Sequence, residues 1–354
     1  MRADTFALRG PVLGIETSCD ETACAVLDCD GQVLAERVLS QADHVPFGGV
    51  VPEIAARAHL AHLPGMARAV LQRAGVSWDG LGGIAATSGP GLIGGLIVGS
   101  GFAKGAALAR NLPFVAVNHL EAHALTARLP GLLPGGAPFP YLLLLVSGGH
   151  CQCVSVLGVG RYERLGGTID DAVGEAFDKV AKVLGLGWPG GPALEILARS
   201  GDPARYDLPR PLLGRPGCDF SFSGLKTAVV RLADTFPPGA LPAQEAADLA
   251  ASFQAAVAEV LADRAAHAMD LFAAAHDGRL LVAAGGVAAN AAVRAALAEA
   301  AARKGFRMAV PPGKLCTDNA VMVAWAGIER LRLGKTDSLG HRPRPRWPLG
   351  ELDG

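Results

Sequence analysis

The 354-residue sequence lacks an excess of charge of either sign. It has 32 Lys and Arg residues against 33 Asp and Glu residues, and only 18% of its residues are charged. A protein whose whole surface binds nucleic acid is strongly basic, so this balance excludes that class, and any RNA contact must come from local patches or a partner. Half of the residues are apolar, which is enough for two domains with well-buried cores.

The sequence also lacks a C-x-x-C pair, and its number of cysteines is odd. Most of the seven cysteines lie among apolar residues in strand-like segments, so we interpret them as core residues in a reducing cytosol rather than as disulfides or a zinc knuckle. They are Cys19, Cys24, Cys29, Cys151, Cys153, Cys218 and Cys316.

Signals for export, for a membrane span and for common nucleotide-binding loops are missing as well. Residues 1–9 contain no apolar segment of a secretory signal. The charge-free stretch 80–103 is long enough to span a membrane, but its many glycines divide it into a strand, a turn and a buried helix. Because neither a G-x-x-x-x-G-K-[ST] loop nor a dinucleotide fingerprint occurs, a P-loop NTPase and a Rossmann dehydrogenase are not supported. We expect a soluble cytoplasmic protein.

A weak internal repeat is present. Residues 12–38 and 141–165 each have the pattern of three short strands joined by tight turns, and each is followed by alternating helix and strand patterns. Two such halves predict an α/β protein with two similar lobes and a ligand cleft between them, the architecture of the actin-like (ASKHA, ribonuclease H-like) superfamily. We place the first lobe at residues 1–136 and the second at 137–354, with a helical or loop insert near 185–245. Its irregular part, 201–241, is rich in Pro, Gly and Arg, and is either a loop over the cleft or a passive linker.

Two histidines in the segment Asn118–His123 are spaced to share a metal ion. At i and i+4 of a helix, the imidazoles of His119 and His123 lie about 6 Å apart on one face. Paired surface histidines also occur by chance, so the spacing alone leaves both interpretations open. A zinc protease would need Glu directly after the first histidine; position 120 is Leu, and Glu121 lies roughly opposite the histidine face.

A carboxylate from elsewhere would complete such a metal site. Asp318, at a predicted strand-to-helix junction, is the best candidate, since two histidines and one carboxylate leave positions open for substrate. The alternative is that Thr317 or Asp318 caps the following helix.

Glycine turns at equivalent points of the repeat predict an anion site. Backbone N–H groups of Ser147–Gly149, and of the turn at Ser18, can approach phosphate oxygens closely, although hairpins also use such turns routinely. Gly285 to Asn290 follows a buried strand and opens a helix, so it can lie against a nucleotide, with Gly190–Pro192 as an opposite wall; a helix cap and a plain turn are the alternatives.

Acidic residues form two further groups. Asp20 and Glu21 lie in the first predicted turn. Asp171, Glu175 and Asp178 share one face of a helix, which is usually solvated, yet Asp178 could instead enter the cleft and bind a ribose or amino group.

With these residues in view, the sequence closely resembles the TsaD family (also called Gcp or YgjD), the tRNA N6-adenosine threonylcarbamoyltransferases. The matching segments lie in the family's order from Leu13 to Leu349: GIETSCDET, FGGVVPEIAAR, SGPGLIGGL, NHLEAH, LVSGGH, DDAVGEAFDKVAKVLGL, PGGP, DFSFSGLKT, AGGVAAN, CTDNA and RPRWPL.

The resemblance implies one metal ion, usually iron(II), bound by His119, His123 and Asp318, with zinc and magnesium as alternatives. It implies that substrate is bound by Leu145, Val146, Ser147, Gly148, Gly149, Asp178, Gly191 and Asn290. The implied reaction transfers the threonylcarbamoyl group from threonylcarbamoyl-adenylate to N6 of the adenosine 3′ of the anticodon, in tRNAs that read codons starting with A, and releases AMP. The implied accessory subunits are an inactive paralogue, TsaB, and a small ATPase, TsaE.

Three hypotheses complete the sequence-based picture. Asp20 or Glu21 accepts the proton of the attacking amine. Lys226 and the arginines at 342, 344 and 346 contact tRNA phosphates, although the tail could equally be a solvated or packed terminus. The competing functions are a metal-dependent O-sialoglycoprotein endopeptidase, which Leu120 opposes, and an actin-type sugar kinase or ATPase, which leaves the two histidines and Asp318 without a purpose.

Overall fold

A computed structural model describes residues 8–47, 49–187, 189–237, 239 and 241–352. The segment in which we sought a secretory signal lies almost entirely outside these residues. The chain forms two compact units. The first contains residues 1–137, 159–161 and 318–354, and the second contains 138–158 and 162–317.

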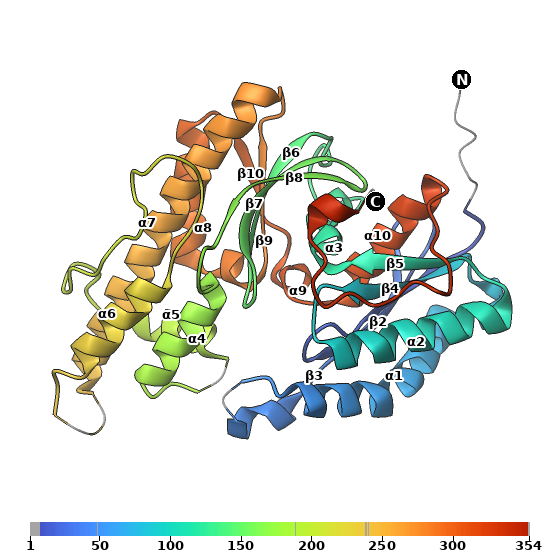
Figure 1. Cartoon of the computed structure of the whole chain (residues 1–354), viewed down its shortest axis with the longest axis horizontal. Helices are drawn as coiled ribbons and strands as arrows, with labels where there is room; N and C mark the ends of the chain where they lie inside the picture. The colour runs from blue at the N-terminus through green and yellow to red at the C-terminus, as the bar shows by residue number, and fades with distance from the viewer. Residues whose placement is uncertain (1–7, 48, 188, 238, 240, 353–354) are drawn as a thin grey trace. The chain divides into compact units, whose positions relative to one another are not determined.

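The first unit contains a five-stranded sheet in the order β3-β2-β1-β4-β5 (Figure 1). Strands β1 (Val12–Glu16), β2 (Glu21–Leu27) and β3 (Val33–Ser40) form an antiparallel meander. Strands β4 (Gly83–Gly89) and β5 (Phe114–Asn118) extend the sheet in parallel with β1. The carboxyl ends of these three strands therefore lie at the same edge of the sheet, where the residues that follow them can meet.

Helices cover both faces of this sheet. Helices α1 (Pro52–Ala74) and α2 (Ile93–Arg110) pack on one face, while α3 (His119–Leu125) and α10 (Ala320–Arg332) pack on the other (Figure 1). The side chains that β1 presents to α1 are fully buried, among them Leu13 and Ile15. On the opposite face, Gly14 lets α10 approach so closely that a Cβ atom there would overlap the backbone of Ala320.

Glycines bring α2 against the turn that follows β1. A Cβ atom at Gly95 or at Gly99, one helical turn later, would overlap atoms of Thr17, and one at Gly91 would overlap Ser18. The Thr17 hydroxyl donates to the carbonyl of Gly95 at 2.9 Å. Glycines of the segment SGPGLIGGL therefore hold the first turn in place by close backbone contact.

The second unit repeats the topology of the first, with strand order β8-β7-β6-β9-β10. Strands β6 (Tyr141–Val146) and β7 (Cys151–Gly158) are antiparallel, β8 (Arg161–Gly167) completes the meander, and β9 (Leu280–Ala284) and β10 (Arg307–Ala309) run parallel to β6. The repeat seen in the sequence is therefore a structural one, and the prediction of two similar actin-like α/β lobes is confirmed.

The helices of the second unit share a core with one face of its sheet. Apolar side chains of β6, such as Leu142 and Leu144, pack with Phe177, Phe253 and Leu297 from three of these helices. The helices that contribute to this core are α4 (Val173–Val183), α5 (Gly190–Ala198), α6 (Ser223–Ala233), α7 (Ala243–Ala275) and α8 (Ala291–Arg303). The short helix α9 (Gly313–Cys316) follows β10.

Two features differ from the sequence-based expectation. The segment 201–241, expected to be irregular, contains helix α6. Asp170 accepts hydrogen bonds from the backbone N–H groups of Phe222 and Ser223 and from the Ser221 and Ser223 hydroxyls, and so fixes the start of this helix from outside the segment. In addition, residues 318–354, expected in the second lobe, belong to the first unit because α10 packs on β1, β2, β4 and β5.

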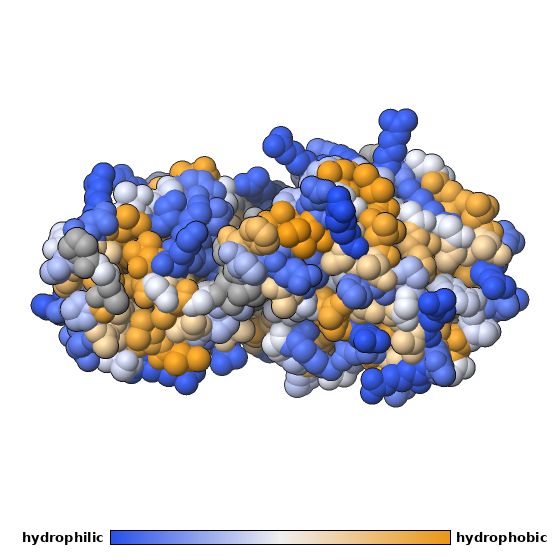
Figure 2. Space-filling view, turned by 90° about the horizontal axis from the view of Figure 1, so that it is seen from below, coloured by the Kyte–Doolittle hydropathy of each residue, from blue (hydrophilic) through white to orange (hydrophobic). Residues whose placement is uncertain are grey.

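The surface mixes polar and apolar residues. Figure 2 shows hydrophobic residues next to hydrophilic ones over much of the visible face. Exposed apolar side chains include Leu60 and Ile97 in the first unit and Ile196 in the second. Single exposed apolar residues are common in folded proteins. Among the described residues, none of the helices combines the length and the apolar composition that a membrane span needs.

Candidate metal centre and nucleotide-binding turns

Helix α3 begins at the carboxyl end of β5, at the edge where β1 and β4 also end. Asn118 is its N-cap, and its side-chain oxygen accepts hydrogen bonds from the N–H groups of Leu120 at 2.9 Å and Glu121 at 3.3 Å. The amide nitrogen of the same side chain donates to the carbonyl of Trp347 in the C-terminal segment. Both ends of the Asn118 side chain are therefore used to fix the start of the helix that carries the two histidines.

His119, His123 and Asp318 converge at this edge. The Nε2 atoms of His119 and His123 lie 3.4 Å and 3.2 Å from the same Asp318 oxygen, Oδ1. One candidate ligand atom from each residue lies within 4.8 Å of the others, and both histidines are buried. Two imidazole nitrogens and one carboxylate oxygen suit iron(II), zinc and related divalent ions and leave coordination positions open. The geometry therefore fits a metal site, and all three residues belong to the first unit.

The charges of this cluster support one another. Burial alone would lower the pKa of His119, but the carboxylates of Asp318 and Glu16 raise it well above the usual value. Burial would raise the pKa of Asp318, yet the two histidines hold it well below the usual range. Asp318 therefore carries the negative charge that a bound cation needs.

Asp318 does not cap helix α10. The cap is the next residue, Asn319, whose side-chain oxygen accepts from the N–H of Met322 at 2.9 Å. The alternative reading of Asp318 as a helix cap is thus excluded, and its carboxylate is directed to the histidines.

Glu121 faces away from the candidate metal site and is fully buried. One of its oxygens accepts from Arg330 Nε of α10 at 2.8 Å, and the other accepts from the backbone N–H of Gly160 at 3.0 Å. Its carboxylate joins α3 to α10 and cannot act as the general base of a zinc protease. Together with Leu120, this contact argues against the endopeptidase alternative.

Asp20 and Glu21 lie at the turn between β1 and β2. Asp20 is buried, and its carbonyl accepts from the N–H of Gln41. Burial, together with the carboxylates of Asp318 and Asp20, raises the pKa of Glu21 to about 9. The charge of Asp318 in the candidate metal site therefore affects the protonation of Glu21 in the acidic turn, and both residues belong to the first unit.

In the second unit, the two predicted nucleotide-binding turns lie side by side. The N–H of Ser147 donates to the carbonyl of His150, which closes a turn around Gly148 and Gly149. A Cβ atom at Gly285 would overlap the carbonyl of Val146, so the turn after β9 packs directly on the one after β6. This places Leu145 to Gly149 next to the segment that leads to Asn290.

The other predicted substrate residues of this unit have structural partners. Asp178 accepts from the N–H of Gly190 at 2.9 Å, and so fixes the start of α5 beside Gly191. Asn290 caps α8 through the N–H of Val293 and donates to Gln254 at 2.8 Å. The capping role considered for Asn290 from the sequence is therefore real, and a substrate contact would be an additional role.

Comparison with known proteins decides the family. A family model described as "TsaD: tRNA N6-adenosine threonylcarbamoyltransferase" matches residues 32–325. A protein of that name from Granulibacter bethesdensis is 65% identical over 350 residues, which cover 97% of this chain and 95% of the relative. Its counterpart from Rhodospirillum rubrum is 60% identical over 345 residues, covering 96% of this chain and 94% of the relative. The chain belongs to the TsaD family.

Solved structures with lower sequence identity to this TsaD-family chain support the fold alone. HypF from T. kodakarensis matches 92% of this chain and 49% of its own length, with a TM-score of 0.61 and 15% identity. Component A of (R)-2-hydroxyglutaryl-CoA dehydratase from Acidaminococcus fermentans matches 92% of this chain and all of its own, with a TM-score of 0.51 and 16% identity. These likenesses agree with the actin-like, two-lobed α/β architecture.

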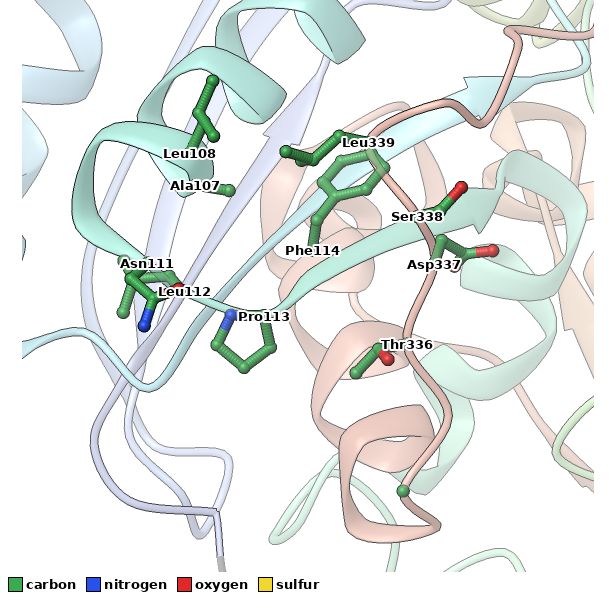
Figure 3. A pocket seen from close by; sticks show the side chains of 11 residues that line it. Ala107, Leu108, Asn111, Leu112, Pro113, Phe114, Thr336, Asp337, Ser338 and Leu339 are labelled. Carbon is green, nitrogen blue, oxygen red and sulfur yellow. The ribbon is translucent and has the colours of Figure 1, made fainter.

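A separate pocket of about 470 Å³ lies at the start of β5, whereas His119 and His123 follow the end of that strand. Figure 3 shows Leu108 of α2, Phe114 of β5 and Leu339 of the C-terminal segment around it. The nearby Asp337 carboxylate accepts from the N–H of Ala116, which joins the C-terminal segment to the edge strand. The five residues of β5 separate this pocket from His119, so it is not part of the candidate metal site.

Sequence reasoning overlooked one polar residue of this TsaD-family site. Glu16, the last residue of β1, is fully buried, and one of its oxygens lies 3.2 Å from His119 Nδ1. The only signal in the sequence was a glutamate at the end of the apolar segment VLGIE. A strand pattern alone does not show whether such a residue is buried in the strand or lies in the turn that follows it.

Proposed function

We propose that the protein transfers a threonylcarbamoyl group from threonylcarbamoyl-adenylate to N6 of the adenosine 3′ of the anticodon, in tRNAs that read codons starting with A. The amine attacks the carbonyl carbon of the mixed anhydride, the bond to the phosphate oxygen breaks, and AMP leaves. The observation that carries this proposal is the convergence of His119, His123 and Asp318 in a chain of the TsaD family.

His119, His123 and Asp318 would hold one divalent ion, for which we propose iron(II), with zinc or magnesium as alternatives. When bound, the ion supplies a Lewis acid that polarises and orients oxygens of the substrate. The chain's own contribution is a preformed, largely buried set of two nitrogens and one oxygen. Metal analysis of protein purified without oxygen would distinguish the three ions.

Residues of the second unit would bind the adenylate. The N–H groups of the Ser147–Gly149 turn are of the kind that bind phosphate oxygens, and Gly148 and Gly149 have open space where a side chain would be. Gly191 and Asn290 would bind the nucleoside, with Asp178 at the start of α5. Leu145 and Val146, buried at the end of β6, would position the turn.

Asp20 or Glu21 would accept the proton that the amine loses. Because the pKa of Glu21 is raised to about 9, that carboxyl keeps its proton at neutral pH in the metal-free protein. Asp20 lies beside Glu21 in the same turn, and the substitutions Asp20→Asn and Glu21→Gln distinguish the two possible acceptors.

We propose the cytoplasm as the site of action, tRNA as a substrate, and TsaB and TsaE as accessory subunits. The nearly neutral chain has a net charge of −1, so its own surface offers no general attraction for RNA. A multisubunit enzyme would supply the missing tRNA contacts.

The proposal is tested by incubating the purified protein with tRNA, threonylcarbamoyl-adenylate and the accessory subunits, and by analysing tRNA nucleosides with mass spectrometry. We expect threonylcarbamoyladenosine from the native protein, and none from His123→Ala. The matched control is His62→Ala, on the outer face of α1, which should leave product formation unchanged. Absence of the modified nucleoside with every accessory subunit present would refute the proposed activity.

A further inference from the structure

Glu16 lies behind the candidate metal site and contacts groups from three segments. One of its oxygens, Oε1, accepts from the N–H of Ser18 at 2.5 Å. The other, Oε2, accepts from the Thr87 hydroxyl at 2.5 Å and lies 3.2 Å from His119 Nδ1. Glu16, Thr87 and His119 are all buried. The Thr87 hydroxyl of β4 and the Ser18 N–H of the first turn therefore hold the carboxylate in place independently of its contact with His119.

The two ring nitrogens of His119 face different groups. Nδ1 lies 3.2 Å from Glu16 Oε2 and 3.2 Å from the Ser18 hydroxyl, whereas Nε2 faces Asp318, a member of the candidate ligand set. Carboxylates only accept hydrogen bonds, so in the metal-free protein either nitrogen can donate to the carboxylate that it faces. The ring form that can bind an ion beside Asp318 is the one in which Nδ1 carries the hydrogen and donates it to Glu16. In that form the lone pair of a neutral imidazole is on Nε2, the atom that faces Asp318 at 3.4 Å. Carboxylates that contact metal-bound histidines in this way fix the ring and strengthen binding.

We propose that Glu16 is a positioning residue of the metal site, which presents His119 Nε2 to the ion by accepting a hydrogen bond from Nδ1. The inference rests on the proposed metal site but not on the transfer reaction. It can therefore fail while the proposed activity stands, because metal binding is measured without tRNA or adenylate.

Glu16 contacts the Nδ1 atom of His119 but not that of His123. His123 Nδ1 is buried and, within the described part of the chain, has no hydrogen-bond partner. Glu16 therefore acts on one of the two imidazoles, and its removal should weaken metal binding without abolishing it. Asp318 and His123 remain as ligands.

Glu121→Gln provides a matched control for Glu16→Gln. Both residues are fully buried glutamates beside the histidines, and both substitutions replace a carboxylate with an amide of the same size. Glu121, however, contacts Arg330 and Gly160 rather than an imidazole. A loss of affinity caused only by disturbing a buried carboxylate should occur in both variants, whereas loss of ring positioning should occur only in Glu16→Gln.

The first measurement is zinc affinity of the full-length protein, determined by competition with a chromogenic chelator. We expect Glu16→Gln to bind zinc about 10- to 100-fold more weakly than the native protein. Glu121→Gln should remain within about threefold. If Glu16→Gln binds as tightly as the native protein, or loses no more than Glu121→Gln does, the positioning role is wrong.

The second measurement needs no folded variant at position 16. In native protein labelled with ¹⁵N-histidine and loaded with zinc, long-range ¹H–¹⁵N correlation spectra report which nitrogen of each ring binds the metal. The His119 signals are assigned by their loss in His119→Gln. We expect His119 to bind zinc through Nε2 and to carry hydrogen on Nδ1; coordination through Nδ1 would overturn the proposal.

Discussion

At the scale of single residues, the site contains both oppositely charged neighbours, which stabilise each other's ionised forms, and carboxylates that lie close to one another. His119 and Asp318 favour each other's charged forms, while Glu21 is placed among carboxylates that disfavour its own. Perturbed acids and bases gather at functional sites because chemistry needs them there, often at a cost in stability. Predictions for individual residues therefore concern both activity and stability.

The acidic turn provides the first prediction. If Asp20 accepts the amine proton, Asp20→Asn should slow single-turnover transfer by about 100-fold or more, the usual range for a general base. Glu21→Gln should then slow it less, because Glu21 would not be the group that accepts the proton. The measurement is rapid-quench transfer with preformed threonylcarbamoyl-adenylate. Unchanged rates in both variants would remove the turn from the proton-transfer step.

The raised pKa of Glu21 provides the second prediction, on stability. The unfolded chain loses this proton near the ordinary glutamate pKa of 4.5, whereas the raised pKa keeps the proton on the folded, metal-free protein until about pH 9. Between these two pH values Glu21 is ionised in the unfolded chain but protonated in the folded protein, so the free energy of unfolding falls as pH rises. Glu21→Gln should raise the melting temperature of the metal-free protein at pH 8 by at least about 2 °C, and by less at pH 5.

Thermal unfolding in the presence of a chelator checks this prediction. The control is Glu53→Gln on α1, where the carboxylate is exposed and pairs with Arg57 across one helical turn. That substitution should change the melting temperature little at either pH. A lower melting temperature for Glu21→Gln at pH 8 would contradict the prediction.

At the scale of elements, the glycines of α2 set how closely the helix approaches the first turn. Gly95 packs on Thr17, whereas Gly105, ten residues along the same helix, has open space around it. The same substitution should thus have opposite effects at the two positions.

We expect Gly95→Ala to destabilise the fold by about 1–3 kcal/mol, because the added methyl group forces the helix away from Thr17. Gly105→Ala should stabilise it by up to about 1 kcal/mol through helix propensity. The free energy of unfolding from urea denaturation distinguishes them. Equal effects would mean that close packing against the first turn is not what requires glycine at position 95.

Elements with a strong sequence pattern could be predicted, and those fixed by distant contacts could not. The meanders and the helices between them follow from alternating and helical apolar patterns, so the two-lobed fold could be predicted from the sequence. Helix α6 was overlooked because its start depends on Asp170, some fifty residues earlier. The position of α10 on the first sheet depends on close contact at Gly14, which a linear pattern does not contain.

The candidate site was partly predictable for the same reason. The spacing of His119 and His123 indicated a shared face, and the predicted strand-to-helix junction made Asp318 the best candidate for a third ligand. That local signal also fitted a helix cap, so the family resemblance was needed to favour the metal site over the cap. Glu16 was overlooked because its role depends on contact with a different strand and helix.

At the scale of the whole molecule, near neutrality means that tRNA must be bound by local groups. In the C-terminal segment, Arg344 pairs with Glu351 and lies over the Trp347 ring, so it has a packing role. Lys226 pairs with Asp171 at 2.9 Å. Arg342 and Arg346 are exposed and are the better candidates for phosphate contacts.

Replacing both Arg342 and Arg346 by Gln should weaken tRNA binding about equally for all sequences. It should also lower the slope of log affinity against log salt by about 1 to 2, because up to two phosphate contacts are lost. Filter binding at several salt concentrations measures both quantities. Arg303→Gln, at the end of α8, serves as the control, and an unchanged slope in the double variant would show the segment to be only a packed terminus.

The chain passes from the second unit to the first between Thr317 and Asp318, so all three candidate ligands belong to a single folded body. The three side chains are therefore positioned by contacts within that body. An ion held in this way could be loaded before any substrate arrives and retained through successive rounds of AMP release. Its exchange would then be governed by the stability of one sheet edge rather than by turnover.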